Sequence, residues 1–214
     1  MNNSAVLFNY ESCGFFINIF NQNLLEGWGA ILIEIRWHGR GGQGGVVASR
    51  IAAKAAFYEG YYSQAFPFFG AERRGAPVTA FTRISKEEIK LRSQIYEPDI
   101  IVIMDPALVR SEDSWKGLKN GGIVVANSEK LEPMGRPSKI AIVNATRIAL
   151  DLGLVSEGLP RPNTAMVGAF SKVTGLISLE NVKKAILDVL GPRIAKVNID
   201  AAERAYNETK VIEL

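Results

Sequence analysis

The apolar and polar residues of this chain alternate between two periods, one typical of buried strands and one typical of amphipathic helices. Residues 31–35 form an apolar run interrupted only by Glu34, which predicts a buried strand. After a glycine-rich turn, Val47, Ile51, Ala55 and Tyr58 recur at helical spacing. This first strand, turn and helix sets the pattern for the rest of the chain.

Further strand-like and helix-like stretches follow in alternation. Strands are predicted over residues 61–66, 78–84, 99–104, 123–126 and 140–143, and helices over 108–118, 144–152, 164–174 and 178–190. Asn144 and Ser178 are placed as helix caps, and Gly191-Pro192 as a helix end. The alternation predicts an α/β fold, a three-layer Rossmann-like sandwich around a mainly parallel sheet. Residues 31–214 are expected to form one domain.

Composition narrows the class of protein. The 214 residues are 47% hydrophobic and 22% charged, with a net charge of +3 that is spread along the chain. These values describe a soluble globular protein and argue against a nucleic-acid partner. One cysteine, Cys13, excludes an internal disulfide framework and fits the cytoplasm. No apolar stretch is long enough for a membrane span. Residues 1–30 are expected either to be a packing extension or to derive from translation upstream of the true start.

The turn after the first strand is the main candidate for chemistry. It consists of Gly39, Arg40, Gly41, Gly42, Gln43 and Gly44, here called the glycine loop. Glycines allow close approach of a ligand or of another backbone, and the helix that follows offers free N–H groups to an anion. The loop fits the dinucleotide expression G-x-G-x-x-G, but the second predicted strand ends at Phe66-Pro67 without the acid that would hold a ribose. Tight packing alone is the other explanation of the glycines.

A second loop indicates, together with the glycine loop, which family the chain resembles. About thirty residues after the glycine loop comes the sequence Phe69-Gly70-Ala71-Glu72-Arg73-Arg74-Gly75, here called the arginine loop. Together the two loops make the chain, from about Ile33 onward, similar to the gamma subunits of 2-oxoacid:ferredoxin oxidoreductases, above all those of pyruvate and 2-ketoisovalerate. The strand at residues 98–102 and Asn163 with residues 166–169 also fit that family. Ala76 departs from it, because many relatives have a glycine there.

The resemblance implies a subunit of a complex rather than an enzyme active alone. Such complexes decarboxylate a 2-oxoacid oxidatively with coenzyme A, giving an acyl-CoA, carbon dioxide and reduced ferredoxin. Thiamine diphosphate, magnesium and [4Fe–4S] clusters are expected on alpha, beta and delta-type partner subunits, since one cysteine cannot ligate a cluster. The alternatives are a stand-alone NAD(P)-binding oxidoreductase using the glycine loop, and a purely structural assembly subunit.

The roles of individual side chains stay open at this point. We expect the glycine loop, Glu72, Arg73, Arg74, Gly75 and Asn163 to bind a cofactor or to contact partner subunits. The arginine loop is otherwise a solvated segment with weak ion pairs. His38 is expected to be structural. Asp105, at the end of a predicted strand, fits either a ligand site or a helix cap, and Asn163 fits either a cap or an interface contact.

Overall fold

A computed structural model describes residues 32–68, 75–130 and 133–214. The expected extension over residues 1–30 and the arginine-loop residues Glu72, Arg73 and Arg74 lie outside the described residues. The strands are β1 (Leu32–Arg40), β2 (Tyr62–Pro67), β3 (Pro77–Ser85), β4 (Ile100–Ile103), β5 (Ile123–Asn127), β6 (Lys139–Val143), β7 (Val155–Ser156), β8 (Leu159–Pro160) and β9 (Lys210–Glu213). The helices are α1 (Gly45–Tyr58), the 3₁₀ turn η2 (Leu108–Arg110), α2 (Glu112–Trp115), α3 (Ala145–Asp151), α4 (Asn163–Thr174), α5 (Leu179–Leu190) and α6 (Pro192–Glu208).

Seven of the strands form one sheet, in the order β2-β3-β1-β4-β5-β6-β9, and β7 pairs with β8 in a small hairpin. Strands β1, β4, β5 and β6 are parallel neighbours, whereas β3 and β9 run antiparallel to the strands beside them. The mainly parallel sheet predicted from the sequence is therefore confirmed. What the local pattern did not indicate is that β3 lies between β1 and β2.

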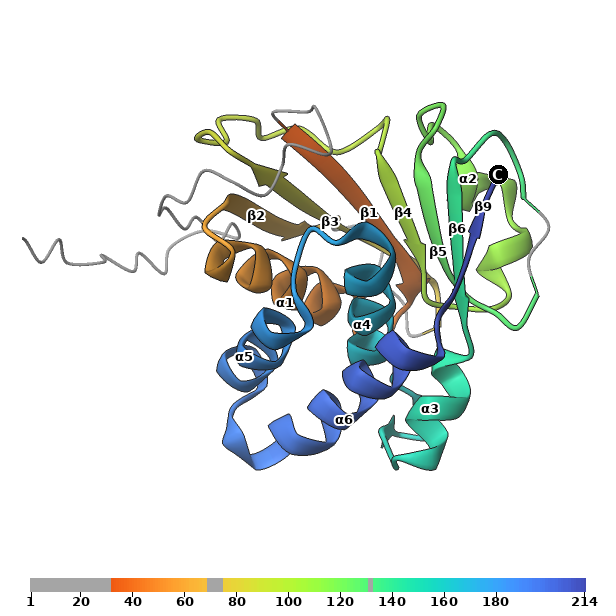
Figure 1. Ribbon diagram of the computed structural model, residues 1–214. Helices are drawn as coiled ribbons and strands as arrows, with labels where there is room; N and C mark the ends of the chain where they lie inside the picture. Colours follow the sequence, from red (N-terminus) through yellow and green to blue (C-terminus); the bar gives the residue numbers. More distant parts are fainter. Residues whose placement is uncertain (1–31, 69–74, 131–132) are drawn as a thin grey trace, which may run out of the picture.

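Helices cover the two faces of the sheet unequally. Helices α1, α4, α5 and α6 pack on one face, while α2 lies on the other (Figure 1). The larger core lies under the four helices and includes Trp37, Ile51 and Phe170, all fully buried. A smaller core around Ile101, Val124 and Trp115 covers the second face. The sandwich thus has both outer layers, although the second is thin.

The helix predicted over residues 108–118 was wrong in extent. The chain there forms η2 and then the single turn of α2. Ser111 has an extended conformation between the two, with φ −91° and ψ 120°. Gly117 has a φ of +78°, and a β carbon there would overlap the carbonyl of Tyr96. The backbone therefore turns back toward β5 instead of continuing as a helix.

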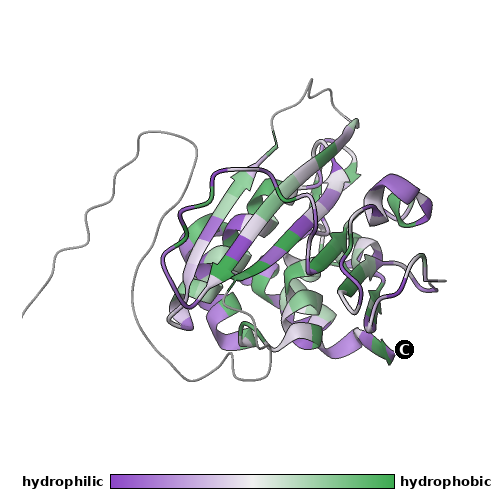
Figure 2. Cartoon of the chain, turned by 90° about the horizontal axis from the view of Figure 1, so that it is seen from above, coloured by the Kyte–Doolittle hydropathy of each residue, from purple (hydrophilic) through white to green (hydrophobic). Residues whose placement is uncertain are grey.

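Polar bands cross the otherwise hydrophobic strands on one side of the sheet (Figure 2). Buried polar residues of β1, β2 and β3 include Arg36, Gln64 and Arg83. Arg83 is 1% exposed, and its Nε donates to Glu34 Oε1 over 2.9 Å. A second donation, to the backbone oxygen of Ser93 at 2.8 Å, ties the segment after β3 to the sheet. These arginines are structural, because their donors face acceptors of the chain itself.

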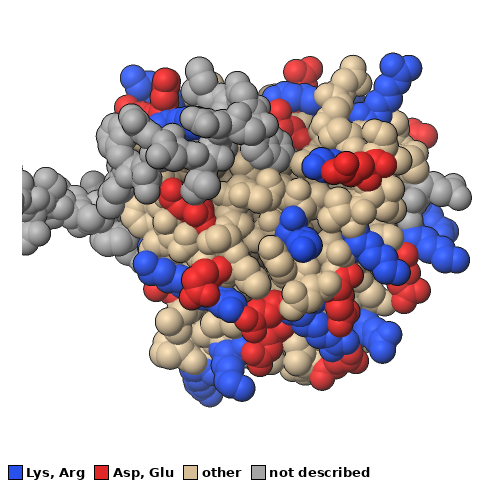
Figure 3. Space-filling model, viewed as in Figure 1, with Lys and Arg blue, Asp and Glu red and all other residues tan. Residues whose placement is uncertain are grey.

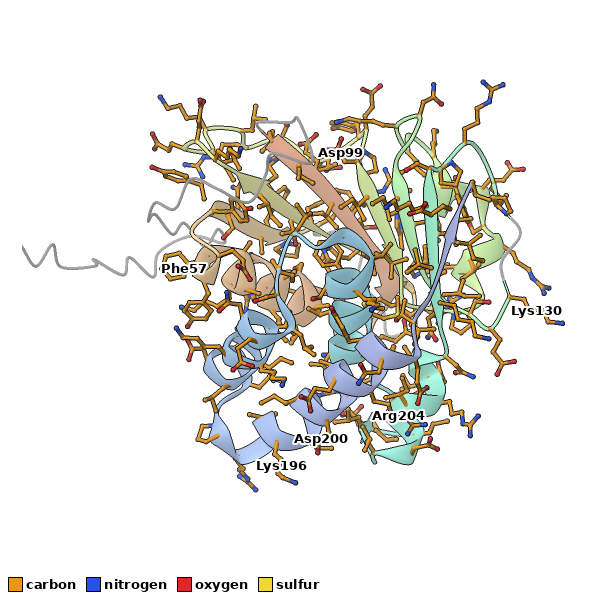
Figure 4. The ribbon with its side chains drawn as sticks, viewed as in Figure 1. Phe57, Asp99, Lys130, Lys196, Asp200 and Arg204 are labelled. Atoms are coloured by element: carbon orange, nitrogen blue, oxygen red, sulfur yellow. The ribbon has the colours of Figure 1, made fainter. Side chains whose placement is uncertain are left out.

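Charged side chains of both signs are interspersed on the face seen in Figure 3. Several belong to helix–helix ion pairs, such as Arg204 of α6 with Asp151 at the end of α3 (Figure 4), which are 2.9 Å apart. This face therefore carries no patch of a single sign. Among the described helices, none combines the length and the apolar character that crossing a membrane requires.

Candidate functional site

The glycine loop lies where the connections of the sheet change direction. Strand β1 leads through α1 to β2 at one edge, whereas the neighbouring strand β4 leads through η2 and α2 toward β5 and the other edge. The two crossover segments lie on opposite faces (Figure 1). In open α/β sheets, such a switch point opens a crevice at the carboxyl ends of the two strands, and ligands bind there. The glycine loop follows β1, and Asp105 follows β4.

The two ends of the sheet can be followed in Figure 4. Asp99 marks the amino end of β4, and Lys130 lies just beyond the carboxyl end of β5. Asp99 accepts a hydrogen bond from the backbone of Glu34 at 2.8 Å and pairs with Lys119 at 2.8 Å. It is therefore a structural residue remote from the switch point. Asp105, which follows the carboxyl end of β4, instead contacts the glycine loop through Gln43.

The backbone of the glycine loop needs glycine at two positions. Gly42 has a φ of +98°, and Gly44, the N-cap of α1, has a φ of +85°. No side chain caps α1. In the described part of the chain, the N–H groups of the first helical turn, residues 45–47, have no acceptor. The loop therefore presents donors and the positive end of a helix dipole.

The same glycines also pack closely against other elements. A β carbon on Gly44 would lie 2.5 Å from Nδ2 of Asn163 in α4, and one on Gly39 would lie 3.1 Å from Cε of Met104. Above Gly42, the nearest atom is Cδ1 of Leu159, at 3.4 Å from such a carbon. Packing thus explains part of the glycine content. Met104 and Leu159 were not predicted as neighbours of the loop, because they are distant in sequence.

Gln43 holds the loop together with both ends of its side-chain amide. Its Oε1 accepts a hydrogen bond from the backbone N–H of Arg40 at 2.8 Å, and its Nε2 donates to Oδ2 of Asp105 at 2.7 Å. Oδ1 of Asp105 accepts from the N–H of Ala107 at 3.0 Å and lies 3.3 Å from Nε of Arg40. The sequence left open whether Asp105 belongs to a ligand site or caps a helix. In the structure, Asp105 caps the following turn and also anchors the glycine loop.

The end of the arginine loop meets the glycine loop. Nη1 of Arg40 donates to the backbone oxygen of Gly75 at 3.0 Å, and the N–H of Gly41 donates to the oxygen of Ala76 at 3.0 Å. The structure therefore brings Gly75 to the glycine loop, as a joint surface requires. Because Glu72, Arg73 and Arg74 lie outside the described residues, their contribution to that surface stays a prediction.

Asn163 is the first residue of α4, and Pro162 takes the N-cap position. Oδ1 of Asn163 accepts a hydrogen bond from the N–H of Thr164 at 2.9 Å, and the amide of Asn163 lies directly over Gly44. Only 6% of the residue is exposed. Asn163 thus serves the N-terminus of its helix and at the same time supports the glycine loop.

His38 is a structural residue. Its Nε2 accepts a hydrogen bond from Nε of Arg36 at 2.8 Å, which requires that nitrogen to be unprotonated. Burial lowers the pKa of His38 to about 3, and the positive charge of Arg36 acts in the same direction. The imidazole is therefore neutral near neutral pH, in agreement with its expected structural role.

A hollow of about 310 Å³ adjoins the switch point at the carboxyl ends of β4, β5 and β6. Its walls are formed by Pro106, Arg110, Asn127, Ser128, Glu129, Lys130 and Asn144. Asn127 is fixed by bonds to the oxygen of Met104 and to Oγ1 of Thr146, both 2.7 Å long. Arg110 and Lys130 bring two positive charges to this edge of the sheet, against the one negative charge of Glu129.

Two kinds of site receive no support from the geometry. In the described ranges, no three acidic, histidine or cysteine side chains come together as a metal site would require. The dinucleotide fold places its ribose-binding acid on the strand next to β1. Here the neighbour of β1 on that side is the antiparallel β3, and β2 is one strand farther away.

Comparison with known proteins agrees with the resemblance seen in the sequence. A model of the pyruvate ferredoxin/flavodoxin oxidoreductase family matches residues 34–208. The pyruvate/ketoisovalerate oxidoreductases common subunit gamma of Thermococcus kodakarensis is 53% identical, over 86% of this chain and 100% of the relative. The pyruvate synthase subunit PorC of Methanocaldococcus jannaschii is 55% identical, over 83% and 97%.

A solved structure shows the same fold. The crystal structure of the pyruvate oxidoreductase subunit PORC of Thermotoga maritima superimposes with a TM-score of 0.73 and is 38% identical in sequence. The match covers 86% of this chain and 100% of the other. The fold class predicted from the sequence is thereby confirmed.

Proposed function

This chain belongs to the pyruvate ferredoxin/flavodoxin oxidoreductase family, and we propose that it is the gamma subunit of a pyruvate/2-ketoisovalerate:ferredoxin oxidoreductase. The observation that carries this proposal is the match over the whole length of a relative with that subunit name. The complex would convert a 2-oxoacid and coenzyme A into an acyl-CoA and carbon dioxide, and pass the electrons to ferredoxin. The two alternatives, an NAD(P)-binding oxidoreductase and a purely structural assembly subunit, are not supported.

The cysteine content of the chain limits which cofactors of the complex it can bind itself. With one cysteine in the sequence, it cannot supply the ligands of a [4Fe–4S] cluster. We therefore assign the clusters, thiamine diphosphate and magnesium to alpha, beta and delta-type partner subunits, with ferredoxin as the electron acceptor. The cytoplasmic location expected from the sequence is part of the same proposal.

For the glycine loop we propose contact with an anionic part of coenzyme A in the assembled complex. Two features support this role: the position at the switch point, and the N–H groups at the start of α1, which have no acceptor among the described residues. The hollow lined by Arg110 and Lys130 extends the same edge of the sheet and suits a further phosphate. Gly75 and the rest of the arginine loop would border this surface.

Two experiments test the assignment. Purification of the chain from its native source should recover partner subunits with iron–sulfur absorbance and bound thiamine diphosphate; recovery as a clean monomer would count against the proposal. Titration of the isolated chain with NAD(H) and NADP(H) should show no binding in the micromolar range. Saturable binding there would instead favour the dinucleotide alternative.

A further inference from the structure

The carboxylate of Asp105 joins the end of β4 to the glycine loop. Gln43 and Asp105 are 9% and 8% exposed, so their contact of 2.7 Å is sheltered from water. A hydrogen bond to a charged group is stronger than one between neutral groups. The pair is separated by 62 residues in sequence and is the shortest side-chain link described between the loop and the neighbouring strand.

This contact determines which way the amide of Gln43 points. An ionised carboxylate can only accept hydrogen bonds, so the NH₂ end of Gln43 must face Asp105. The carbonyl end is then directed at the N–H of Arg40, where it accepts the bond of 2.8 Å. Asp105 thus acts through Gln43 on the backbone that leads into the two positive-φ glycines.

Arg40 offsets the negative charge that this arrangement needs. Its Nε lies 3.3 Å from Oδ1 of Asp105, and its Nη1 binds the oxygen of Gly75. Without a cation nearby, the carboxylate would weaken the attraction of the α1 N-terminus for an anion. With Arg40 in place, the loop keeps its anchor and the helix end stays favourable for negative charge.

We propose that Asp105 and Gln43 are positioning residues for the anionic co-substrate, coenzyme A in the function proposed above, with Arg40 as their charge partner. They hold the glycine loop in the conformation that directs the first N–H groups of α1 toward the ligand. This inference rests on the proposed function. It adds a specific prediction, namely that exchanging donor and acceptor between positions 43 and 105 preserves the site.

The test is an exchange of the two side chains in the assembled complex. Gln43→Glu places two carboxylates against each other, and Asp105→Asn places an NH₂ group where an acceptor is needed. In the double variant Gln43→Glu/Asp105→Asn, the new Asn can donate to the new Glu, which still accepts from the Arg40 N–H. The double variant also keeps the net charge. Asp113→Asn, at an exposed residue of α2, is the matched control for loss of an acid.

We expect Gln43→Glu to raise the KM for coenzyme A about tenfold, the effect of one lost charge-assisted hydrogen bond. The double variant should return to within roughly threefold of the wild type. The KM for the 2-oxoacid should stay within about twofold throughout, because the exchanged residues act on coenzyme A and not on the 2-oxoacid. An unchanged KM for coenzyme A in Gln43→Glu, or a double variant no better than the single ones, would overturn the proposal.

A second measurement separates this proposal from the proposed function. Inorganic pyrophosphate serves as the probe of the isolated full chain, with binding followed by NMR. We expect the same order of affinities for pyrophosphate. Binding should be about tenfold weaker in Gln43→Glu than in the wild type, and it should be restored in the double variant. A chain that fails to assemble with its partners but shows this order would contradict the proposed function and retain the positioning role. A complex that assembles normally but shows no such order in either measurement would contradict the positioning role and retain the proposed function.

Discussion

Replacing Gly44 by Ala tests the geometry of the glycine loop more sharply than any other single change. Gly44 has φ +85° and ψ 31°, a left-handed conformation that costs a residue with a β carbon about 1–2 kcal/mol. The new carbon would also lie 2.5 Å from Nδ2 and 3.0 Å from Cγ of Asn163, which is buried. Overpacking of this kind costs about 1–3 kcal/mol. The two effects sum to a loss of about 2–5 kcal/mol in the free energy of unfolding.

Gly175→Ala is the matched control. Gly175 ends α4 with φ +64° and ψ 3°, and no atom lies within 4 Å of a β carbon built there. It should therefore show the conformational cost alone, about 1–2 kcal/mol. Urea unfolding of the isolated chain gives both values. We expect Gly44→Ala to lower the free energy of unfolding by about 1–3 kcal/mol more than Gly175→Ala does. This difference should become smaller when Asn163 is also replaced by Ala. Equal losses in the two variants would refute the seating of Asn163 over the loop.

Two further predictions concern the core and its response to pH. In Gly168→Ala, the new β carbon would overlap the carbonyl of Ala202 in α6, so the contact between α4 and α6 must open at a cost of about 1–3 kcal/mol. The higher helix propensity of alanine offsets about 0.5–1 kcal/mol of this cost. A lower Tm is expected, and an unchanged Tm would show that the two helices are not in such close contact. The second prediction concerns His38, whose folded pKa of about 3 lies below its unfolded value near 6.5. The unfolded chain therefore takes up the proton first, and stability should fall as pH drops from 6.5 toward 3, by up to about 1.4 kcal/mol per pH unit. His38→Gln keeps an acceptor for Arg36 and should remove this contribution; identical pH profiles in urea unfolding would contradict it.

The sequence predicted best what is determined locally. Asn144 and Ser178 cap α3 and α5 as expected, with side-chain oxygens accepting from Arg147 at 2.9 Å and from Asn181 at 3.2 Å. The start of α1 after the glycine loop was also predicted. In each case the residues that determine the structure lie within a few positions of one another.

The sequence pattern missed helix α6 and the strands β7, β8 and β9, and α6 and β9 were missed for physical reasons. Helix α6 buries mainly small residues, among them Ala195, Ala201 and Ala205, because it lies close against α4 at Gly168. Gly191-Pro192 was interpreted only as the end of the preceding helix, although proline is also favoured at the first position of a helix, so α6 escaped detection. Strand β9 is exposed along its whole length and pairs only with β6 at the edge of the sheet, so its sequence carries no alternation to detect.

The candidate site could be predicted only in part. The glycine loop, Gly75 and Asn163 were identified from the sequence, and the structure brings them together. The links that join them are long-range: Asp105 to Gln43, Leu159 above Gly42, and β3 between β1 and β2. Contacts of this kind depend on the order of strands in the sheet, which a local pattern does not encode.

In the function proposed above, this chain completes a 2-oxoacid:ferredoxin oxidoreductase. The most direct measurement is the reduction of ferredoxin, dependent on a 2-oxoacid and coenzyme A, by the alpha, beta and delta-type subunits with and without this chain. We expect full activity only when the chain is added, and none from the chain alone. Full activity of the partner subunits in its absence would contradict it.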